Sequence, residues 1–237
     1  MNKIMLIAHR GVTETGSHEN TLDAYKKAIE LNLDGIEIDI HKTKDNLYVC
    51  HHDHDIDGKL IKDYNYNQIL EFSNKYNYKV PLLKEVLELC KGKIFLDIEL
   101  KEESYEKEIC DFVLSFLNYN EFCFRSFSDK TVRTIKKYNK SIKCGLLLGV
   151  KKGKYFLITR LSELFPLVRI LYTKCDFVSP HYNLVLLGYI QRMHLIRKPV
   201  IVWTVNTETI MKKLIKNNVD GIITDKVSIL INIVQKR

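Results

Sequence analysis

The 237-residue sequence lacks several features that would place it in a specialised class of protein. Its apolar runs fall short of the roughly 18 residues that a membrane-spanning helix needs. No Gly-x-Gly-x-x-Gly motif follows the first apolar segment, as it would in a dinucleotide-binding domain. Six cysteines stand singly, without a Cys-x-x-Cys pair. The composition, 46% hydrophobic and 28% charged, excludes a disordered or collagen-like chain.

The amino-terminal segment does not resemble a secretion signal. Residues 3–8 form a short apolar run, and His9 and Arg10 follow at once, without a small-residue cleavage site. Most of the cysteines lie in apolar runs, where a free thiol behaves as a small hydrophobic side chain. We therefore expect a cytoplasmic protein with reduced cysteines.

The charge is clearly positive. Lys and Arg number 37 against 29 Asp and Glu, which gives a formal net charge of +8. Such an excess is compatible with a nucleic acid, an acidic membrane surface or an anionic substrate. Because the lysines are scattered and do not alternate with aromatic residues, a non-catalytic nucleic-acid-binding protein is the weaker interpretation.

Short apolar, β-branched runs alternate with segments of helical periodicity along the chain. We expect helices at 19–32, 82–90, 103–118, 129–138, 184–196, 208–217 and 227–235. Strands are expected at 3–8, 34–40, 94–100, 122–126, 142–148, 175–179, 199–205 and 219–224. Eight strands alternating with helices predict a closed (β/α)8 TIM barrel of the α/β class, with a doubly wound open sheet as the alternative. The length fits a single domain over 1–237.

Two segments interrupt this alternation. Residues 46–81 hold a short strand at 47–51 and a Tyr- and Asn-rich stretch at 63–78, and we expect them to form a small insertion over the active-site mouth. Residues 150–174 begin with Lys151-Lys152-Gly153-Lys154 and continue into an apolar stretch. We expect this stretch to form an outer helix of the barrel. The alternative is that it forms a lip that touches a membrane.

Carboxylates gather at the carboxyl ends of two predicted strands, where barrels place their active sites. Glu37 and Asp39 are two residues apart on one strand, so both point to the same face. Glu99, at the end of the next strand, would bring a third carboxylate to the same mouth, and Asp97 shares its face. An all-oxygen set suits Mg²⁺ or Ca²⁺, whereas the alternative is that nearby Arg and Lys balance these charges.

Histidines and cations accompany the carboxylates. His9 and His52 would supply two imidazoles for proton transfer near neutral pH. Arg10 and Lys101 would add fixed positive charge suited to a phosphate oxygen, or would simply balance the carboxylates. Together these groups predict hydrolysis of a phosphodiester.

An ordered series of motifs resembles the glycerophosphodiester phosphodiesterase family. The motifs cover nearly the whole chain and are listed in order: His9-Arg10-Gly11, Glu19-Asn20-Thr21, Gly35-Ile36-Glu37-Ile38-Asp39-Ile40, Thr43-Lys44-Asp45, Val49 to His52-Asp53, Pro81 to Leu87, Ile98-Glu99-Leu100-Lys101, Ser126-Phe127, Trp203-Thr204-Val205-Asn206 and Asp220 to Asp225.

The resemblance implies a TIM barrel that hydrolyses glycerophosphodiesters to glycerol 3-phosphate and an alcohol with a divalent cation, Mg²⁺ or Ca²⁺. It implies that the metal ligands are Glu37, Asp39 and Glu99. His9 and His52 would be the acid–base pair, with His9 as the base and His52 as the acid in the first step. Arg10 and Lys101 would bind the phosphate, and Trp203 would line the pocket.

Departures from the family pattern concern substrate choice more than reaction type. His18 stands where the family often has Pro, Asn46 where it often has Gly, and Asp57-Gly58 where an Arg is usual. Residues 150–174 have little resemblance to the family. A lysophospholipase-D-like or sphingomyelinase-D-like enzyme that acts on membrane lipids with the same metal and histidines is therefore the alternative function.

Overall fold

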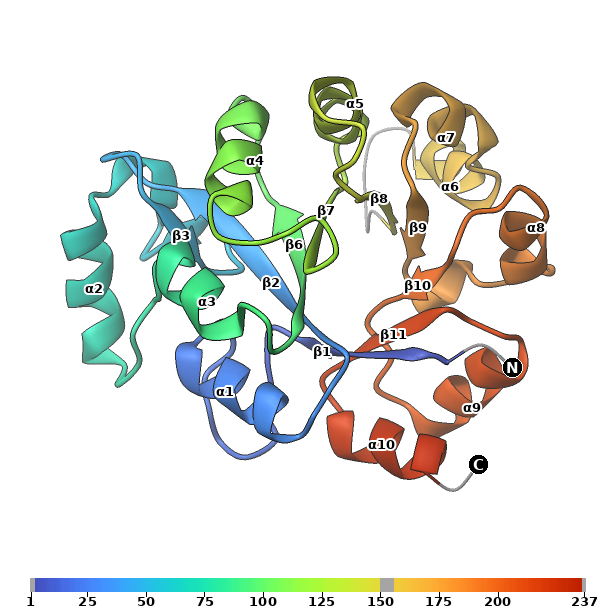
Figure 1. Ribbon diagram of the computed structural model, residues 1–237, viewed down its shortest axis with the longest axis horizontal. Coiled ribbons are helices and arrows are strands. Elements are labelled where there is room, and N and C mark those ends of the chain that lie inside the picture. Colours follow the sequence, from blue (N-terminus) through green and yellow to red (C-terminus); the bar gives the residue numbers. More distant parts are fainter. Residues whose placement is uncertain (1–2, 150–155, 236–237) are drawn as a thin grey trace.

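The computed structural model describes residues 3–149 and 156–235, in which eight parallel strands form a nearly closed barrel with helices outside it (Figure 1). The strands are β1 (Met5–His9), β2 (Gly35–Lys42), β6 (Phe95–Leu100), β7 (Phe122–Ser126), β8 (Cys144–Leu148), β9 (Phe177–Pro180), β10 (Ile201–Val202) and β11 (Gly221–Thr224). The predicted TIM barrel is confirmed.

The order β10-β11-β1-β2-β6-β7-β8-β9 brings the two ends of the sheet together. Isolated parallel bridges join Val178 to Val200 and His181 to Trp203, which closes the circle between β9 and β10. The predicted strand at 199–205 is shorter than expected, because regular pairing with β11 covers only Ile201 and Val202.

The helices follow the predicted alternation: those predicted at 129–138 and 227–235 have the predicted bounds, whereas those predicted at 19–32 and 103–118 are shorter at both ends. They are α1 (Leu22–Glu30), α3 (Leu83–Cys90), α4 (Glu106–Leu114), α5 (Asp129–Tyr138), α8 (Tyr189–Leu195), α9 (Glu208–Lys216) and α10 (Val227–Gln235). The hydroxyls of Thr21 and Ser128 accept the backbone N–H groups of Ala24 and Thr131, so side-chain caps begin α1 and α5.

The stretch predicted as one outer helix contains two. α6 (Phe156–Leu164) ends just before Phe165-Pro166, and α7 (Leu167–Thr173) begins after it. Proline has no N–H to continue the first helix but is tolerated where the next one begins. The basic run 151–154 lies outside the described residues.

The segment 46–81 departs from the barrel and has its own small apolar core. β3 (Tyr48–Cys50) pairs antiparallel with the end of β2, and β4 (Asp55–Ile56) pairs with β5 (Lys59–Leu60). A 3-10 helix, η1 (Ile61–Asp63), and α2 (Tyr66–Lys75) follow, so the Tyr- and Asn-rich stretch is largely helical. The buried side chains of this small core are Val49, Ile56, Ile61, Tyr66, Ile69 and Val80.

Apolar side chains fill the lower interior of the barrel and leave its carboxyl-terminal end to polar residues. Ile7, Cys123, Phe177, Ile201 and Ile223 form one buried cluster inside the barrel. Each inward-facing strand position two residues further on is a candidate for the site, because side chains on a strand alternate between faces. His9 follows Ile7 in this way, and Arg125 follows Cys123.

None of the helices within 3–149 and 156–235 has the length and apolar character needed to span a membrane. The six cysteines all lie in the described part of the chain, and each is buried and free of disulfides.

Candidate active site

Strand register brings the predicted site residues side by side. His9 on β1 pairs with Glu37 on β2, and Asp39 on β2 pairs with Glu99 on β6. All four point into the carboxyl-terminal end of the barrel, because they alternate with residues of the outer core. The register of three adjacent strands therefore assembles groups that are up to 90 positions apart in the chain.

Glu37, Asp39 and Glu99 form a compact acidic trio. One carboxylate oxygen from each lies within 4.8 Å of the other two, and all three side chains are buried. Asp97, which the sequence left open as a ligand, lies outside this trio, where its Oδ1 is 3.2 Å from Arg125 Nε.

Three cations lie against the trio. Lys101 Nζ is 2.7 Å from Asp39 and 2.8 Å from Glu99, and Arg10 Nε is 3.1 Å from Asp39. Arg125 on β7, which the sequence did not single out, lies 3.1 Å from Glu37. These contacts match the alternative in which cations balance the carboxylates, although all three cations also line the cavity described below.

The charges shift the pKa values of the trio in different directions. Burial and the neighbouring Asp39 charge raise the pKa of Glu37, although Arg125 and His9 oppose this. Burial, Asp39 and Glu37 likewise raise the pKa of Glu99 against Lys101. Burial would also raise the pKa of Asp39, but Lys101, Arg10 and the Asn20 amide outweigh it and lower that pKa.

The donor set fits a hard divalent cation. Three clustered carboxylate oxygens are the ligands that Mg²⁺ and Ca²⁺ prefer. The pKa values of Glu37 and Glu99 are raised by burial and by the negative charges of the neighbouring carboxylates. A dication would remove that repulsion.

The motif Glu19-Asn20-Thr21 has a local physical explanation. The Glu19 carboxylate accepts two hydrogen bonds of 3.0 Å from Arg10, and Asn20 Nδ2 donates to Asp39 at 2.9 Å. Thr21 caps α1. Each residue of this turn therefore either orients a site group or begins the helix that follows.

Gly11 completes the first motif for a steric reason. Its φ is +87°, and a Cβ there would lie 2.7 Å from the Cβ of Ala24. The turn after β1 therefore packs directly on α1, which only glycine permits.

Each of the two histidines is held by a carboxylate. His9 Nδ1 lies 2.7 Å from Asp225, just after β11, and its Nε2 faces Glu37 at 3.9 Å. His52 Nδ1 lies 2.8 Å from the adjacent Asp53. A partner on Nδ1 fixes the ring and leaves Nε2 for chemistry. Asp225 ends the motif Asp220 to Asp225, for which the sequence predicts no individual role.

The electrostatic surroundings of the two histidines differ. Burial opposes the charged form of His9, but the Asp225 hydrogen bond and the Glu37 charge outweigh it and raise its pKa. Burial and the Lys101 charge lower the pKa of His52. His9 therefore holds a proton more readily than His52.

A cavity of about 590 Å³ opens at this end of the barrel. Its charged side comes from β1, β2, β6, β7 and the His52 loop, whereas its less polar side follows β7 to β10. The lining residues are His9, Arg10, Glu37, His52, Glu99, Lys101, Arg125, Phe127, Leu147, Gly149, His181, Trp203 and Thr204. Asp39 lies beneath this lining.

Trp203 lies on the less polar side of the cavity. Its indole N–H donates to the Ser179 carbonyl at 2.7 Å, and its ring meets Phe127 and His181 edge to face. Gly149, with φ +136°, lies beneath this group, since a Cβ there would be 2.6 Å from the His181 Cβ. Phe127, His181 and Trp203 thus form a rigid aromatic wall.

Comparison with known proteins agrees with this geometry. Residues 9–229 match the model of the glycerophosphoryl diester phosphodiesterase family. A glycerophosphodiester phosphodiesterase of Caldanaerobacter subterraneus is 30% identical over 252 residues, which cover 99% of each chain.

Solved structures share the fold. A glycerophosphodiester phosphodiesterase of Thermotoga maritima has a TM-score of 0.75 and 24% identity and covers 98% of this chain and 99% of its own. A phosphodiesterase of Oleispira antarctica, in complex with the product sn-glycerol-3-phosphate, has a TM-score of 0.80 and 20% identity over 98% and 96% of the two chains. The protein therefore belongs to the glycerophosphoryl diester phosphodiesterase family.

Proposed function

We propose that the protein hydrolyses glycerophosphodiesters to glycerol 3-phosphate and an alcohol, with a divalent cation and with His9 and His52 as the acid–base pair. One observation carries the proposal: both histidines, each with its Nδ1 held by a carboxylate, line the same cavity as Glu37, Glu99 and three cations. The relative from Caldanaerobacter and the product-bound Oleispira structure support the substrate class.

Glu37, Asp39 and Glu99 would hold the cation. When bound, it would supply positive charge to the non-bridging phosphate oxygens and so stabilise the charge that develops on them. Arg10 and Lys101 would then be available to the same phosphate, because the cation would take over the neutralisation of the carboxylates.

In the first step, His9 takes the proton from the glycerol hydroxyl next to the ester as that oxygen attacks phosphorus. The bond from phosphorus to the alcohol oxygen breaks, and His52 donates a proton to that oxygen. In the second step the roles reverse: His52 takes a proton from water, the water oxygen attacks the cyclic phosphate, and His9 protonates the ring oxygen that leaves. Both histidines end as they began.

The decisive experiment measures glycerol 3-phosphate released from several glycerophosphodiesters, with and without EDTA. We expect EDTA to abolish release and Mg²⁺ or Ca²⁺ to restore it. If activity survives both thorough metal removal and His52→Ala, the proposed chemistry is wrong.

An exposed apolar face favours a second candidate, hydrolysis of lipids in a membrane. Among the described residues, 13 of the 19 exposed large hydrophobic side chains lie between 156 and 196. The most exposed include Leu157 at 81%, Leu187 at 79% and Val168 at 78%. They lie on α6, on α7 and around α8, which are neighbours in the barrel wall (Figure 1). We call this surface the apolar face.

Charge supports an anionic bilayer as the partner that we propose for the apolar face. The stretch 156–198 contains six Lys and Arg residues and only two acidic residues, Glu163 and Asp176. Glu163 is fully buried and paired with Arg160, Asp176 is paired with Lys136, and Arg169 is paired with Asp129. The basic side chains that add to the charge around the apolar groups are therefore Lys174, Arg192, Arg197 and Lys198. An apolar surface edged by cations is the pattern that binds acidic lipid headgroups.

The apolar face is connected to the cavity. The Gly149 N–H, at the cavity wall, donates to the Glu163 carboxylate of α6 at 2.7 Å, and Arg192 of α8 donates to the Leu164 carbonyl at 3.1 Å. These two contacts link the cavity wall to the helices that carry the apolar face.

Sedimentation with vesicles tests the membrane contact. We expect binding to phosphatidylglycerol-containing vesicles, weaker binding to pure phosphatidylcholine, and loss of binding in Leu157→Ser/Leu187→Ser. Leu31→Ser, the same substitution at an exposed leucine outside the apolar face, should bind normally. Absence of binding, or a dimer that the double substitution dissociates, contradicts the proposal. Turnover of glycerophosphocholine against lysophosphatidylcholine then separates the two substrate classes.

A further inference from the structure

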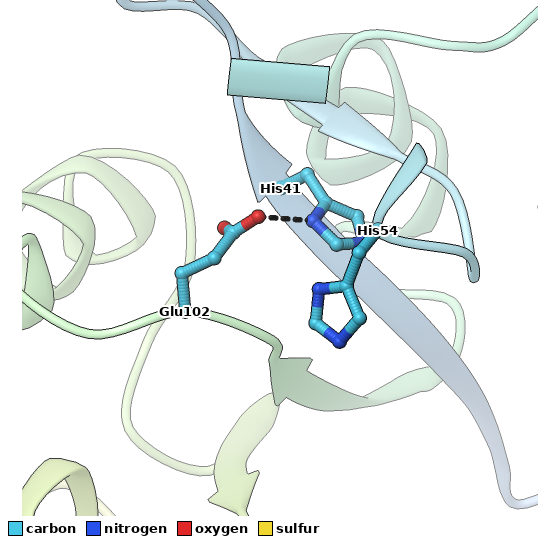
Figure 2. Close-up of side chains that lie close together, drawn as sticks. All are labelled: His41, His54 and Glu102. Carbon is cyan, nitrogen blue, oxygen red and sulfur yellow. Dashed lines mark hydrogen bonds and ion pairs between the residues drawn. The ribbon is translucent and has the colours of Figure 1, made fainter. Parts of the chain in front are cut away.

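Two histidines and a glutamate that the proposed hydrolysis does not use lie together beside the loop of His52. His41 lies on β2, His54 lies just before β4, and Glu102 follows β6 (Figure 2). One potential ligand atom from each residue lies within 4.8 Å of the other two. Three separate segments of the chain converge on this cluster.

Neighbouring groups already hold two members of the cluster in place. His41 is fully buried, and its Nδ1 is hydrogen-bonded to Glu102 Oε1 (Figure 2). The Tyr105 hydroxyl donates to the other Glu102 oxygen at 3.1 Å, and His41 Nε2 faces the His52 carbonyl at 3.5 Å. Ligating histidines usually have such a carbonyl partner on the second ring nitrogen, and ligating carboxylates are usually hydrogen-bonded in turn.

The ligand types differ from those of the acidic trio. Two imidazoles and one carboxylate suit Zn²⁺ and similar transition-metal ions, which leave one position open in such sites, whereas an all-oxygen trio suits Mg²⁺ or Ca²⁺. We propose that His41, His54 and Glu102 form a second metal site, selective for a transition-metal dication.

Binding requires two small movements and one proton release. Zinc ligands lie about 2.0–2.2 Å from the ion, so neighbouring donors of a tetrahedral site lie about 3.4 Å apart, and His41 and Glu102, which are now hydrogen-bonded, must separate to admit the ion. His54 is exposed and can swing inward to supply the third ligand. The proton that His41 and Glu102 share leaves for solvent as the ion takes its place, and imidazole and carboxylate then each give a lone pair to the metal.

An ion at this site would tie β2, the loop after β6 and the loop of residues 51–54 together. His54 is two residues from His52, and the His52 carbonyl already faces His41. The site would therefore hold His52 in place without touching the substrate, which gives it a positioning role.

Calorimetric titration of the full chain with Zn²⁺, in the presence of saturating Mg²⁺ to fill the acidic trio, tests this inference. We expect one Zn²⁺ per chain, and an affinity weakened about tenfold or more by His54→Ala. Because His54 is exposed, this variant should fold normally. His194→Ala, a change at a histidine paired with Asp220 elsewhere on the surface, is the matched control and should bind Zn²⁺ as the parent does.

Two further measurements separate this site from the proposed hydrolysis. Glu99→Gln should lose activity but keep Zn²⁺ binding, and Zn²⁺ should slow amide hydrogen exchange in residues 51–54 of the parent but not of His54→Ala. Absence of Zn²⁺ binding in the parent, or equal binding in His54→Ala, overturns the proposal whatever the activity is.

Discussion

The side of the cavity built by β1, β2 and β6 carries most of its charge, whereas the side built by β8, β9 and β10 is mostly aliphatic and aromatic. The charged side holds the acidic trio, His9 and the loop of His52. The other side offers Leu147, Gly149 and Trp203 and continues outward into the apolar face. We therefore expect bond cleavage to depend on the charged side and the choice of alcohol group to depend on the other side.

The largest effect should come from the charged side. We expect His52→Ala to lower kcat about 10²- to 10⁴-fold, the usual contribution of an acid or base, with less change in KM. His51→Ala is the matched control, because His51 is adjacent in sequence but does not line the cavity. A large loss in the His51 variant and a small one in the His52 variant would show that the wrong histidine was assigned.

Arg125, on β7 where the two sides meet, should matter most for stability. Arg125→Met leaves Glu37 and Asp97 buried without their counter-charge, so we expect the free energy of unfolding to fall by about 3–5 kcal/mol in urea titrations. Lys130→Met removes an exposed pair with Glu103 and should leave the urea unfolding curve almost unchanged. Equal losses in both variants would contradict the view that the buried pair supports the charged side.

Substitution of Trp203 should affect substrate binding more than the chemistry. We expect Trp203→Ala to raise KM about tenfold for glycerophosphodiesters with large alcohol groups and to change kcat less, because aromatic contacts contribute about 1 kcal/mol each. Trp203→Phe should keep most of the contact. A fall in kcat alone, without a change in KM, would place Trp203 with the catalytic groups instead.

The smallest expected effect is a shift of the pH profile. Asp225 raises the pKa of His9, so Asp225→Asn should lower it. If His9 is the base of the first step, the acidic limb of kcat/KM moves to lower pH, because His9 loses its proton more easily. Movement of the alkaline limb instead would make His9 the acid, which is the order that the ligand-free pKa directions favour.

The charged side could be predicted from the sequence because its groups lie on short motifs with a fixed spacing. Glu37 and Asp39 are two residues apart on a strand, and strand alternation alone places them on one face. The barrel itself was predictable from eight alternating runs, since few architectures accommodate that order.

Contacts between distant segments could not be predicted in the same way. In the sequence Arg125 is an ordinary strand-end residue, and its contact with Asp97 depends on the pairing of β7 with β6. Likewise, Asp225 reaches His9 only because β11 pairs with β1. Pro166 marks the break between α6 and α7, but the continuous apolar stretch around it predicts a single helix. The cluster of His41, His54 and Glu102 has no sequence spacing that would reveal it, because each residue comes from a different segment.

The hydrogen bond between His9 and Asp225 joins positions 216 apart in the chain. The His9 ring on the first strand is therefore oriented only after the last strand has paired with it. During synthesis, a chain that has emerged only as far as α9 already contains the acidic trio and His52 but lacks the strand that supports His9. Catalytic competence should therefore arise late and all at once. Two fragments divided in a surface loop before α9 should be inactive apart and regain activity when mixed, provided that the second fragment brings β11 to β1.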